Sequence, residues 1–435
     1  MVYGGGVDRG LRGLAHGAFP DSGVVKILVA SINFAPDHSG IGVYSTDFPK
    51  FLVERGEEVT MVTGFSYYPA WRKRPEDRGR LFATETWKGI RVLRGYLFVP
   101  RRVTTAARLW HEATFCFFAA LNFLRAGRHD AVVVFSPPFL LGLVGKIFSV
   151  LWRCPLVVNV QDLPLDAATS LGMVGRGWFS RTVSALERMV YRGADQVATI
   201  SRGMVDALRA KSVATDKLAL VPNWIAVTGE CSASGEFRRA HPEAEGKFLV
   251  AYAGNLGVKQ GVDCLLCLAK AVERDRRFHF FLIGDGADKP RLLAMADELC
   301  LENTSFLPLL GPANYRAMLT DVDVVFLAQK RGAGDNFFPS KILGVMAQGK
   351  PMLVAADPAS ELSRAVEDWK CGRVESPEDI PKLLQRLEEL ALDTELRGLL
   401  GQNGRREVEE FGREKVLDDW RDQIRRLAEK RQKLA

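Results

Sequence analysis

The fold is decided by Val325-Phe-Leu-Ala-Gln-Lys-Arg-Gly-Ala-Gly-Asp-Asn-Phe-Phe-Pro-Ser-Lys-Ile-Leu-Gly-Val-Met-Ala-Gln-Gly-Lys-Pro-Met-Leu-Val354. This stretch begins within an apolar run, Val324 to Ala328, which is long enough for one strand buried on both faces. A helical segment follows and stops at Gly349, and Met352 to Ala355 form a second apolar run. Strand, helix and strand in this order predict a parallel sheet in an α/β fold.

The segment between the first strand and the helix has the features of an anion site. Gly332 and Gly334 allow backbone angles that other residues avoid. Pro339 and Ser340 suit the first turn of a helix, whose unpaired N–H groups and positive dipole end attract anions. Lys341 adds a full positive charge beside that turn. We therefore expect a phosphate-bearing ligand here, although an ordinary strand–helix connection can have the same pattern.

Length and composition limit the classes of protein to be considered. The chain has 435 residues, too many for one hydrophobic core, so we expect two or three domains. A hydrophobic fraction of 47% and a charged fraction of 26% are typical of a soluble globular protein. The net charge of +7 favours an acidic partner: nucleic acid, anionic lipid or a phosphorylated ligand. Seven scattered cysteines do not suggest a disulfide framework and fit a reducing cytosol.

The alternation of expected strands and helices divides the chain into two halves of the same architecture. Residues 1–23 are glycine-rich and lack the apolar core of a secretory signal, so we expect a disordered extension. We expect one α/β domain over 24–229 and another over 247–411, with the polar stretch 230–246 as the linker. The highly charged final segment, 412–435, is expected to form a helix that packs back towards the first domain.

The first half starts with a βαβ pattern. Lys26 to Asn33 is an expected strand, and Gly40 and Gly42 in the loop after it let the backbone approach a ligand above the sheet. A dinucleotide site is the obvious rival interpretation. However, Ser45 occupies the position of the third glycine of a dinucleotide-binding motif, and no acidic residue follows the second strand, Glu58 to Thr63. A dinucleotide-dependent dehydrogenase is therefore disfavoured.

Two carboxylates follow the expected strand Pro155 to Val160. Asp162 and Asp166 come directly after it, at the end of a strand where ligands bind in open α/β sheets. Asp162 and Asp166 are candidates for contact with an acceptor or a sugar. Both carboxylates can equally cap the helix that follows.

The second half repeats the pattern of a strand, a glycine turn and a helix. The turn Gly254 to Gly261 presents Lys259 near the start of a helix, which is a second plausible phosphate contact. Gly284 and Gly286 form a further turn after the strand Phe278 to Ile283, and again no acidic residue ends the next strand.

Two segments of the first half suggest an interaction surface. The loop Tyr67 to Pro75 interleaves aromatic and cationic side chains, which suits nucleic acid, sugar or phosphate, or simply a solvated loop. Ala106 to Ala126 is an expected helix whose stretch Ala113 to Leu124 is uncharged and contains four phenylalanines. This run is too short to span a bilayer, but with the arginines around it the helix can lie on an anionic membrane or face the core. Nucleic acid is disfavoured because acids interrupt the positive charge, as in Arg74 to Arg78.

Six motifs together resemble a known family, and they cover the chain from about residue 24 to its C-terminus. They are Phe34-Ala-Pro-Asp-His-Ser-Gly-Ile-Gly-Val-Tyr44, Thr63-Gly-Phe-Ser-Tyr-Tyr-Pro69, His111-Glu-Ala-Thr-Phe115, Gln161-Asp-Leu-Pro164, Ala253-Gly-Asn-Leu-Gly-Val-Lys-Gln-Gly261 and Pro339-Ser-Lys341. The chain resembles the GT-B glycosyltransferases, and more narrowly the retaining bacterial enzymes of glycosyltransferase family 4 type that build cell-surface polysaccharides. Its motifs are similar to those of the colanic-acid type of exopolysaccharide enzyme.

The resemblance implies a fold and a set of site residues. It implies two doubly wound, Rossmann-like domains facing a cleft, with the donor site in the second. Lys341, Lys259 and Asp162 are the implied catalytic residues. The implied donor contacts are Gly40, Gly42, Asn255, Gly284, Gly286, Asp335, Asn336 and Ser340.

One departure from the family pattern affects the donor site. The family carries two glutamates eight positions apart; by resemblance the first holds the donor sugar and the second holds the ribose. Asn336 and Gly344 occupy these positions here, with Asp335 beside the first. Asp335 or Asn336 is therefore expected to hold the sugar, and the ribose contact is unassigned.

The resemblance also implies a reaction and its partners. A sugar would move with retention from a nucleotide-diphosphate sugar to a lipid-diphosphate-linked saccharide, without a bound metal or a cofactor. The protein would lie in the cytoplasm against the inner face of an anionic membrane. The alternative is a non-catalytic nucleotide-sugar-binding scaffold of a polysaccharide assembly complex, which the loss of both glutamates favours.

Overall fold

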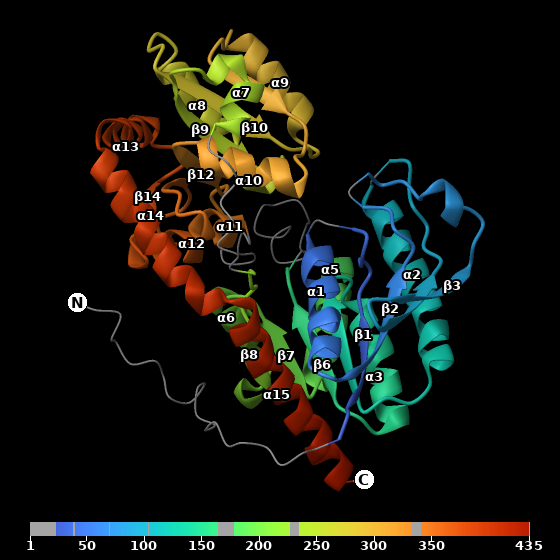
Figure 1. Ribbon diagram of the computed structural model, residues 1–435. Coiled ribbons are helices and arrows are strands. Elements are labelled where there is room, and N and C mark those ends of the chain that lie inside the picture. The colour runs from blue at the N-terminus through green and yellow to red at the C-terminus, as the bar shows by residue number, and fades with distance from the viewer. Residues whose placement is uncertain are drawn as a thin grey trace. The chain divides into compact units, whose positions relative to one another are not determined.

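A computed structural model describes residues 23–37, 40–68, 70–102, 104–163, 178–226, 235–332 and 341–434 (Figure 1). The described residues form two compact units. The first unit extends to Asn223 and includes the C-terminal segment from Glu414, and the second covers Trp224 to Arg413. Of the extension expected over residues 1–23, all but Gly23 lie outside the described residues.

The first unit is built on an eight-stranded sheet in the order β3-β4-β2-β1-β5-β6-β7-β8. Its strands are β1 Lys26–Ala30, β2 Glu58–Gly64, β3 Phe82–Trp87, β4 Ile90–Gly95, β5 Ala131–Ser136, β6 Leu156–Val160, β7 Gln196–Thr199 and β8 Leu218–Leu220. All pairs are parallel except β3 with β4. The strand order reverses between β1 and β5, which is where ligands bind in sheets of this type.

Six helices of the first unit are described. They are α1 Ile41–Glu54, α2 Thr105–Ala126, α3 Leu140–Trp152, α5 Trp178–Gly193, α6 Arg202–Ala210 and α15 Arg413–Lys433. The C-terminal helix α15 packs on this unit, as expected (Figure 1). Its Trp420 stacks on Phe48 with 4.1 Å between ring centroids, and Asp418 accepts two hydrogen bonds from Arg55.

The second unit is built on a six-stranded parallel sheet in the order β11-β10-β9-β12-β13-β14. Its strands are β9 Phe248–Ala253, β10 Phe278–Ile283, β11 Thr304–Leu307, β12 Val324–Ala328, β13 Met352–Ala355 and β14 Gly372–Glu375. Its helices are α7 Glu236–Ala240, α8 Asp263–Ala271, α9 Lys289–Glu298, α10 Pro312–Asp321, α11 Lys341–Ala347, α12 Glu361–Asp368, α13 Ile380–Leu392 and α14 Thr394–Val408.

Both faces of the second sheet are covered by apolar cores. One core packs α7, α10, α11 and α12 against the sheet, and the other packs α8, α9 and α13 against the opposite face. The apolar runs read from the sequence are therefore strands buried on both sides. The prediction of two doubly wound α/β domains is confirmed.

The stretch 230–246, expected to be the linker, differs from that expectation. From Gly235 onward it is folded into the second unit as α7 and a 3₁₀ turn, Pro242–Ala244. The buried carboxylate of Asp321 accepts N–H bonds from Gly235, Phe237 and Arg238 at 2.6 to 3.1 Å. These bonds cap the start of α7 from a residue more than 80 positions away, so the local polarity of the segment was misleading.

Candidate functional site

The candidate site lies at one edge of the second sheet. Because parallel strands end at the same edge, the loops after β9, β10 and β12 meet there. The strand order reverses between β9 and β12, since β10 and β11 lie on one side of β9 while the chain continues on the other. Lys341, the first described residue of α11, lies at this reversal.

The glycine turns after β9 and β10 are locked together through backbone contacts. Gly284 has φ +146°, and a β-carbon there would lie 1.8 Å from the carbonyl oxygen of Gly254. A β-carbon on Gly286 would lie 2.3 Å from the carbonyl oxygen of Leu256. The N–H of Leu256 donates to the carbonyl oxygen of Asp285 at 2.8 Å. Only glycine allows this close approach of two loops, so both glycines are required by the backbone itself.

Lys341 places an ammonium group over this edge. Its Nζ lies 3.6 Å from the centroid of the Tyr252 ring and 3.5 Å from where a β-carbon on Gly254 would be. Within the described residues no carboxylate pairs with Lys341. Burial lowers its pKa to about 7. A partly buried cation with an aromatic ring as its neighbour is suited to bind an anion from outside the chain.

Two further predicted residues follow β9 in the turn that begins at Gly254, the glycine that Lys341 Nζ approaches. Asn255 is exposed in the turn after β9, and its carbonyl oxygen accepts a hydrogen bond from the Tyr252 hydroxyl at 2.7 Å. The carbonyl oxygen of Lys259 accepts the N–H of Lys330 at 3.0 Å, which ties the turn after β9 to the end of β12. Lys341, Lys259, Asn255, Gly284 and Gly286 thus all lie at the carboxyl edge of the second sheet.

The predicted residues of the first half lie in the first unit. Gly40 has φ +59° and precedes α1, and a β-carbon on Gly42 would lie 3.1 Å from the carbonyl oxygen of Asp37. Asp162 is partly buried directly after β6, at the carboxyl edge of the sheet. Asp166, Asp335, Asn336 and Ser340 lie outside the described residues.

Sequence reasoning missed a polar cluster near Gly42. The buried carboxylate of Asp37 accepts a hydrogen bond from Asn33 Nδ2 at 3.0 Å and another from Ser66 Oγ. Burial raises the pKa of Asp37 in spite of these two bonds. Asp37 stood in a motif of the sequence, but no local pattern shows that Ser66, after β2, reaches it.

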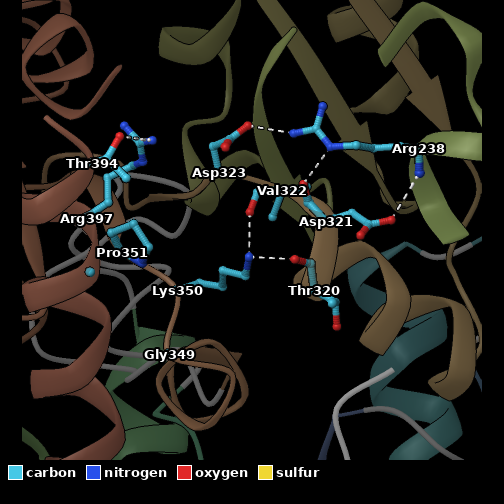
Figure 2. Close-up of a pocket in the computed structure, with 11 residues that line it drawn as sticks. Arg238, Thr320, Asp321, Val322, Asp323, Gly349, Lys350, Pro351, Thr394 and Arg397 are labelled. Carbon is cyan, nitrogen blue, oxygen red and sulfur yellow. Dashed lines mark hydrogen bonds and ion pairs between the residues drawn. The ribbon is translucent and has the colours of Figure 1, made fainter. Parts of the chain in front are cut away.

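A hollow of about 330 Å³ lies at the opposite edge of the second sheet (Figure 2). It is lined by Arg238, Thr320, Asp321, Val322, Asp323, Gly349, Lys350, Pro351, Thr394, Arg397 and Gly398. Asp323 and Pro351 directly precede β12 and β13, so the hollow is at the amino ends of the strands.

The charges around this hollow are already engaged by the chain. Figure 2 shows Lys350 Nζ donating to the carbonyl oxygens of Thr320 and Val322, at 2.7 and 2.9 Å. Arg238 pairs with Asp323 at 2.8 Å. These contacts hold α7 and the segment before β13 to the connection between α10 and β12, and we assign the hollow a structural role.

Comparison with known protein families assigns both halves of the chain. A model described as Glycosyl transferase 4-like domain matches residues 39–224. A model described as Glycosyl transferases group 1 matches residues 234–407. The second match contains the edge with Lys341.

Individual proteins resemble the chain over most of its length. WcaI of Escherichia coli K12, assigned as a glycosyl transferase of colanic acid biosynthesis, is 30% identical over 354 residues, which are 79% of this chain and 86% of WcaI. The solved structure of sucrose-phosphate synthase from Thermosynechococcus elongatus has a TM-score of 0.72 at 18% identity, covering 93% of this chain and 99% of that one. Anabaena HepE, solved in complex with UDP-glucose, has a TM-score of 0.69 at 17% identity, covering 92% and 99%. These two structures share the fold.

Proposed function

The chain belongs to the glycosyltransferases that combine a Glycosyl transferase 4-like domain with a group 1 domain, and from this premise we propose its reaction. The enzyme transfers a sugar from a nucleotide-diphosphate sugar, with retention and without a bound metal. The acceptor is a lipid-diphosphate-linked saccharide of exopolysaccharide or lipopolysaccharide biosynthesis. Lys341 is the observation that carries the donor assignment, because its ammonium group lies over the Tyr252 ring and beside Gly254, at the carboxyl edge of the sheet, where it is suited to bind an anion.

The mechanism follows from the charge that develops on the leaving group. The bond between the sugar C1 and the phosphate oxygen breaks while the acceptor oxygen bonds to C1 on the same face. The leaving diphosphate gains negative charge, and Lys341 and Lys259 stabilise it. A donor phosphate oxygen takes the acceptor's proton, so the reaction needs no separate base. Asp162 orients the acceptor or, as the second possibility, takes that proton itself.

Donor binding is expected to take up a proton above pH 7. Free Lys341 has a pKa of about 7 because of burial, so it is mostly neutral at higher pH. A bound diphosphate favours the charged form and raises this pKa. The affinity for UDP should therefore fall as the pH rises above 7, by up to about tenfold for each pH unit. Calorimetry in buffers of different ionisation enthalpy measures the proton uptake. A Lys341→Arg protein, whose side chain is charged throughout this pH range, should take up no proton. Equal proton uptake by both proteins would contradict the assignment of Lys341 to the diphosphate.

A lipid-linked acceptor fits one surface of the first unit. Trp110, Phe117 and Leu124 of α2 are exposed and spaced by seven residues, so they form one stripe. On the neighbouring α3, Ile147 and Leu151 are exposed on the face turned away from the sheet. An apolar helix face open to water usually marks a protein or membrane contact.

The charges around this surface suit an anionic bilayer. Glu112 is the one acidic residue of α2 and α3, and exposed arginines stand at both ends of the pair, at Arg101, Arg102, Arg128 and Arg153. Apolar side chains flanked by cations are typical of helices that lie in the membrane interface. No helix in the described ranges is long and apolar enough to cross a bilayer. We propose peripheral attachment to the inner face of the cytoplasmic membrane.

Loss of two apolar side chains should weaken membrane binding. Phe117 and Leu151 are 62% and 65% exposed, so replacing both with serine should leave the fold intact. Binding to vesicles with one-third phosphatidylglycerol is expected to weaken by about tenfold or more, because each side chain loses burial in the bilayer. Co-sedimentation measures the effect.

A matched control comes from the second unit. Leu392 and Leu399 are 75% and 56% exposed there, and their replacement with serine should change nothing. Equal binding by both double variants would contradict attachment by α2 and α3, and equal binding of the wild type to neutral phosphatidylcholine vesicles would contradict the role of the flanking arginines. A dimer that dissociates only in the Phe117→Ser, Leu151→Ser protein would indicate a second copy as the occupant instead.

Product analysis tests the reaction. The protein is incubated with a donor and a lipid extract, and the anomeric configuration of the new linkage is determined by NMR. The same configuration as in the donor, with undiminished transfer in excess EDTA, is expected. An inverted linkage or loss of transfer in EDTA would overturn the corresponding part of the proposal, and donor binding without transfer would favour the scaffold interpretation.

A further inference from the structure

Gly344 is a glycine that the fold does not require. It lies in α11, three residues after Lys341 and therefore on the same side of the helix. Its φ is not positive, and a β-carbon there would have only ordinary contacts, the nearest at 3.8 Å. Glycine costs about 1 kcal/mol inside a helix relative to alanine. Neither backbone strain nor packing accounts for it, and its effect is to leave room beside Lys341.

Tyr315 of α10 borders this room. Its hydroxyl is the atom that lies 3.8 Å from the position of the absent β-carbon, and its Cε1 lies at 3.9 Å. The ring packs on the core of the second unit, which fixes the direction of the hydroxyl. Burial raises the pKa of Tyr315 to about 12, so the hydroxyl keeps its proton at neutral pH and can both donate and accept. Within the described ranges this hydroxyl makes no hydrogen bond.

The chemistry of the donor identifies the group that meets Tyr315. In a nucleoside diphosphate the ribose is bonded directly to the phosphates, and its 2′ and 3′ hydroxyls need hydrogen-bond partners when they leave water. With the diphosphate at Lys341, the ribose is the next group along the ligand, and Gly344 is one helical turn away. We propose that Tyr315 hydrogen-bonds a ribose hydroxyl of the donor nucleotide in the room left by Gly344. This inference rests on the proposed function, and it supplies the ribose contact that the sequence left unassigned.

Deoxynucleotides give a test that separates binding from folding. The dissociation constants of UDP, 2′-deoxy-UDP and 3′-deoxy-UDP are measured for the wild type and for Tyr315→Phe, and the three GDP counterparts are measured in the same way. With UDP or GDP, Tyr315→Phe should bind about threefold to tenfold more weakly than the wild type, because one hydrogen bond is lost. With the deoxynucleotide that lacks the bonded hydroxyl, both proteins should bind equally.

The outcomes are distinct. If Tyr315→Phe weakens the binding of all three nucleotides equally, Tyr315 acts only through the fold. If Tyr315→Phe leaves the affinity for UDP and GDP unchanged, Tyr315 makes no contact with the nucleotide. Either result overturns the inference while the donor assignment stands. A wild type that binds neither UDP nor GDP contradicts the donor assignment and this inference together. Gly344→Glu is a second probe, since a side chain filling the room should weaken the contact of Tyr315 and reduce the effect of Tyr315→Phe.

Discussion

Turnover is expected to fall by about a hundredfold or more when Lys341 is replaced with alanine, from the size of the lost charge stabilisation. The ammonium group lies at the carboxyl edge of β9 and β12, over the ring of Tyr252. In the proposed reaction the leaving diphosphate lies beside this ammonium group. Because Lys341 binds the diphosphate of the donor and also stabilises charge that develops in the transition state, the loss should appear in kcat as well as in donor affinity.

Two further variants separate charge from folding. Lys341→Met keeps the length of the side chain without its charge, so it should fold at least as stably, since a partly buried cation is removed, and should lose the same activity. Lys382 is an exposed lysine of α13 whose pKa is raised by Asp379, and Lys382→Ala should be as active as the wild type. A folded Lys341→Met protein with near-normal turnover would refute the role of Lys341.

Gly284→Ala is expected to destabilise the second unit by about 3 kcal/mol or more. The new β-carbon would lie 1.8 Å from the carbonyl oxygen of Gly254, and both positions are backbone atoms that cannot rotate away. The φ of +146° is also one that alanine rarely adopts. The turn after β9 must move to make space for the new β-carbon. Any Gly284→Ala protein that still folds should therefore also bind the donor more weakly.

A second glycine provides the control for this prediction. Gly398 lies within α14, and a β-carbon there would meet nothing within 4 Å. Gly398→Ala should therefore raise the free energy of unfolding by about 0.5 to 1 kcal/mol. Denaturant titration monitored by circular dichroism measures both variants. Equal stability of the two alanine proteins would show that the loops after β9 and β10 are not locked as described.

Much of the fold could be predicted from local patterns. The strands are continuous apolar runs, and a buried parallel sheet needs such runs, so the sequence predicts β10, β12 and β13 at their observed bounds. Lys341, Lys259 and Gly284 each follow one of the expected strands, so the sequence also predicts that they lie beyond the carboxyl ends of strands. The antiparallel strand β3 carries only partly buried and exposed residues and has no such signal.

The parts that could not be predicted depend on contacts between distant residues. The cap that Asp321 places on α7 joins positions far apart in the sequence, and so does the bond from Ser66 to Asp37. In the sequence Tyr252 cannot be distinguished from the other residues of an apolar strand, although its ring lies under Lys341 in the structure. Tyr315 likewise shows no local signal, because its relation to Gly344 exists only when α10 and α11 lie side by side.

Nucleotide release from a panel of donors is the most direct test of the central claim, that this chain is an active glycosyltransferase with its donor site at Lys341. The purified protein is incubated with UDP-, GDP-, dTDP- and ADP-sugars, with and without a lipid extract from the native host. We expect release from one donor that increases with lipid and is lost in Lys341→Met. Release from none of the donors with lipid present, or equal release by Lys341→Met, would contradict the account.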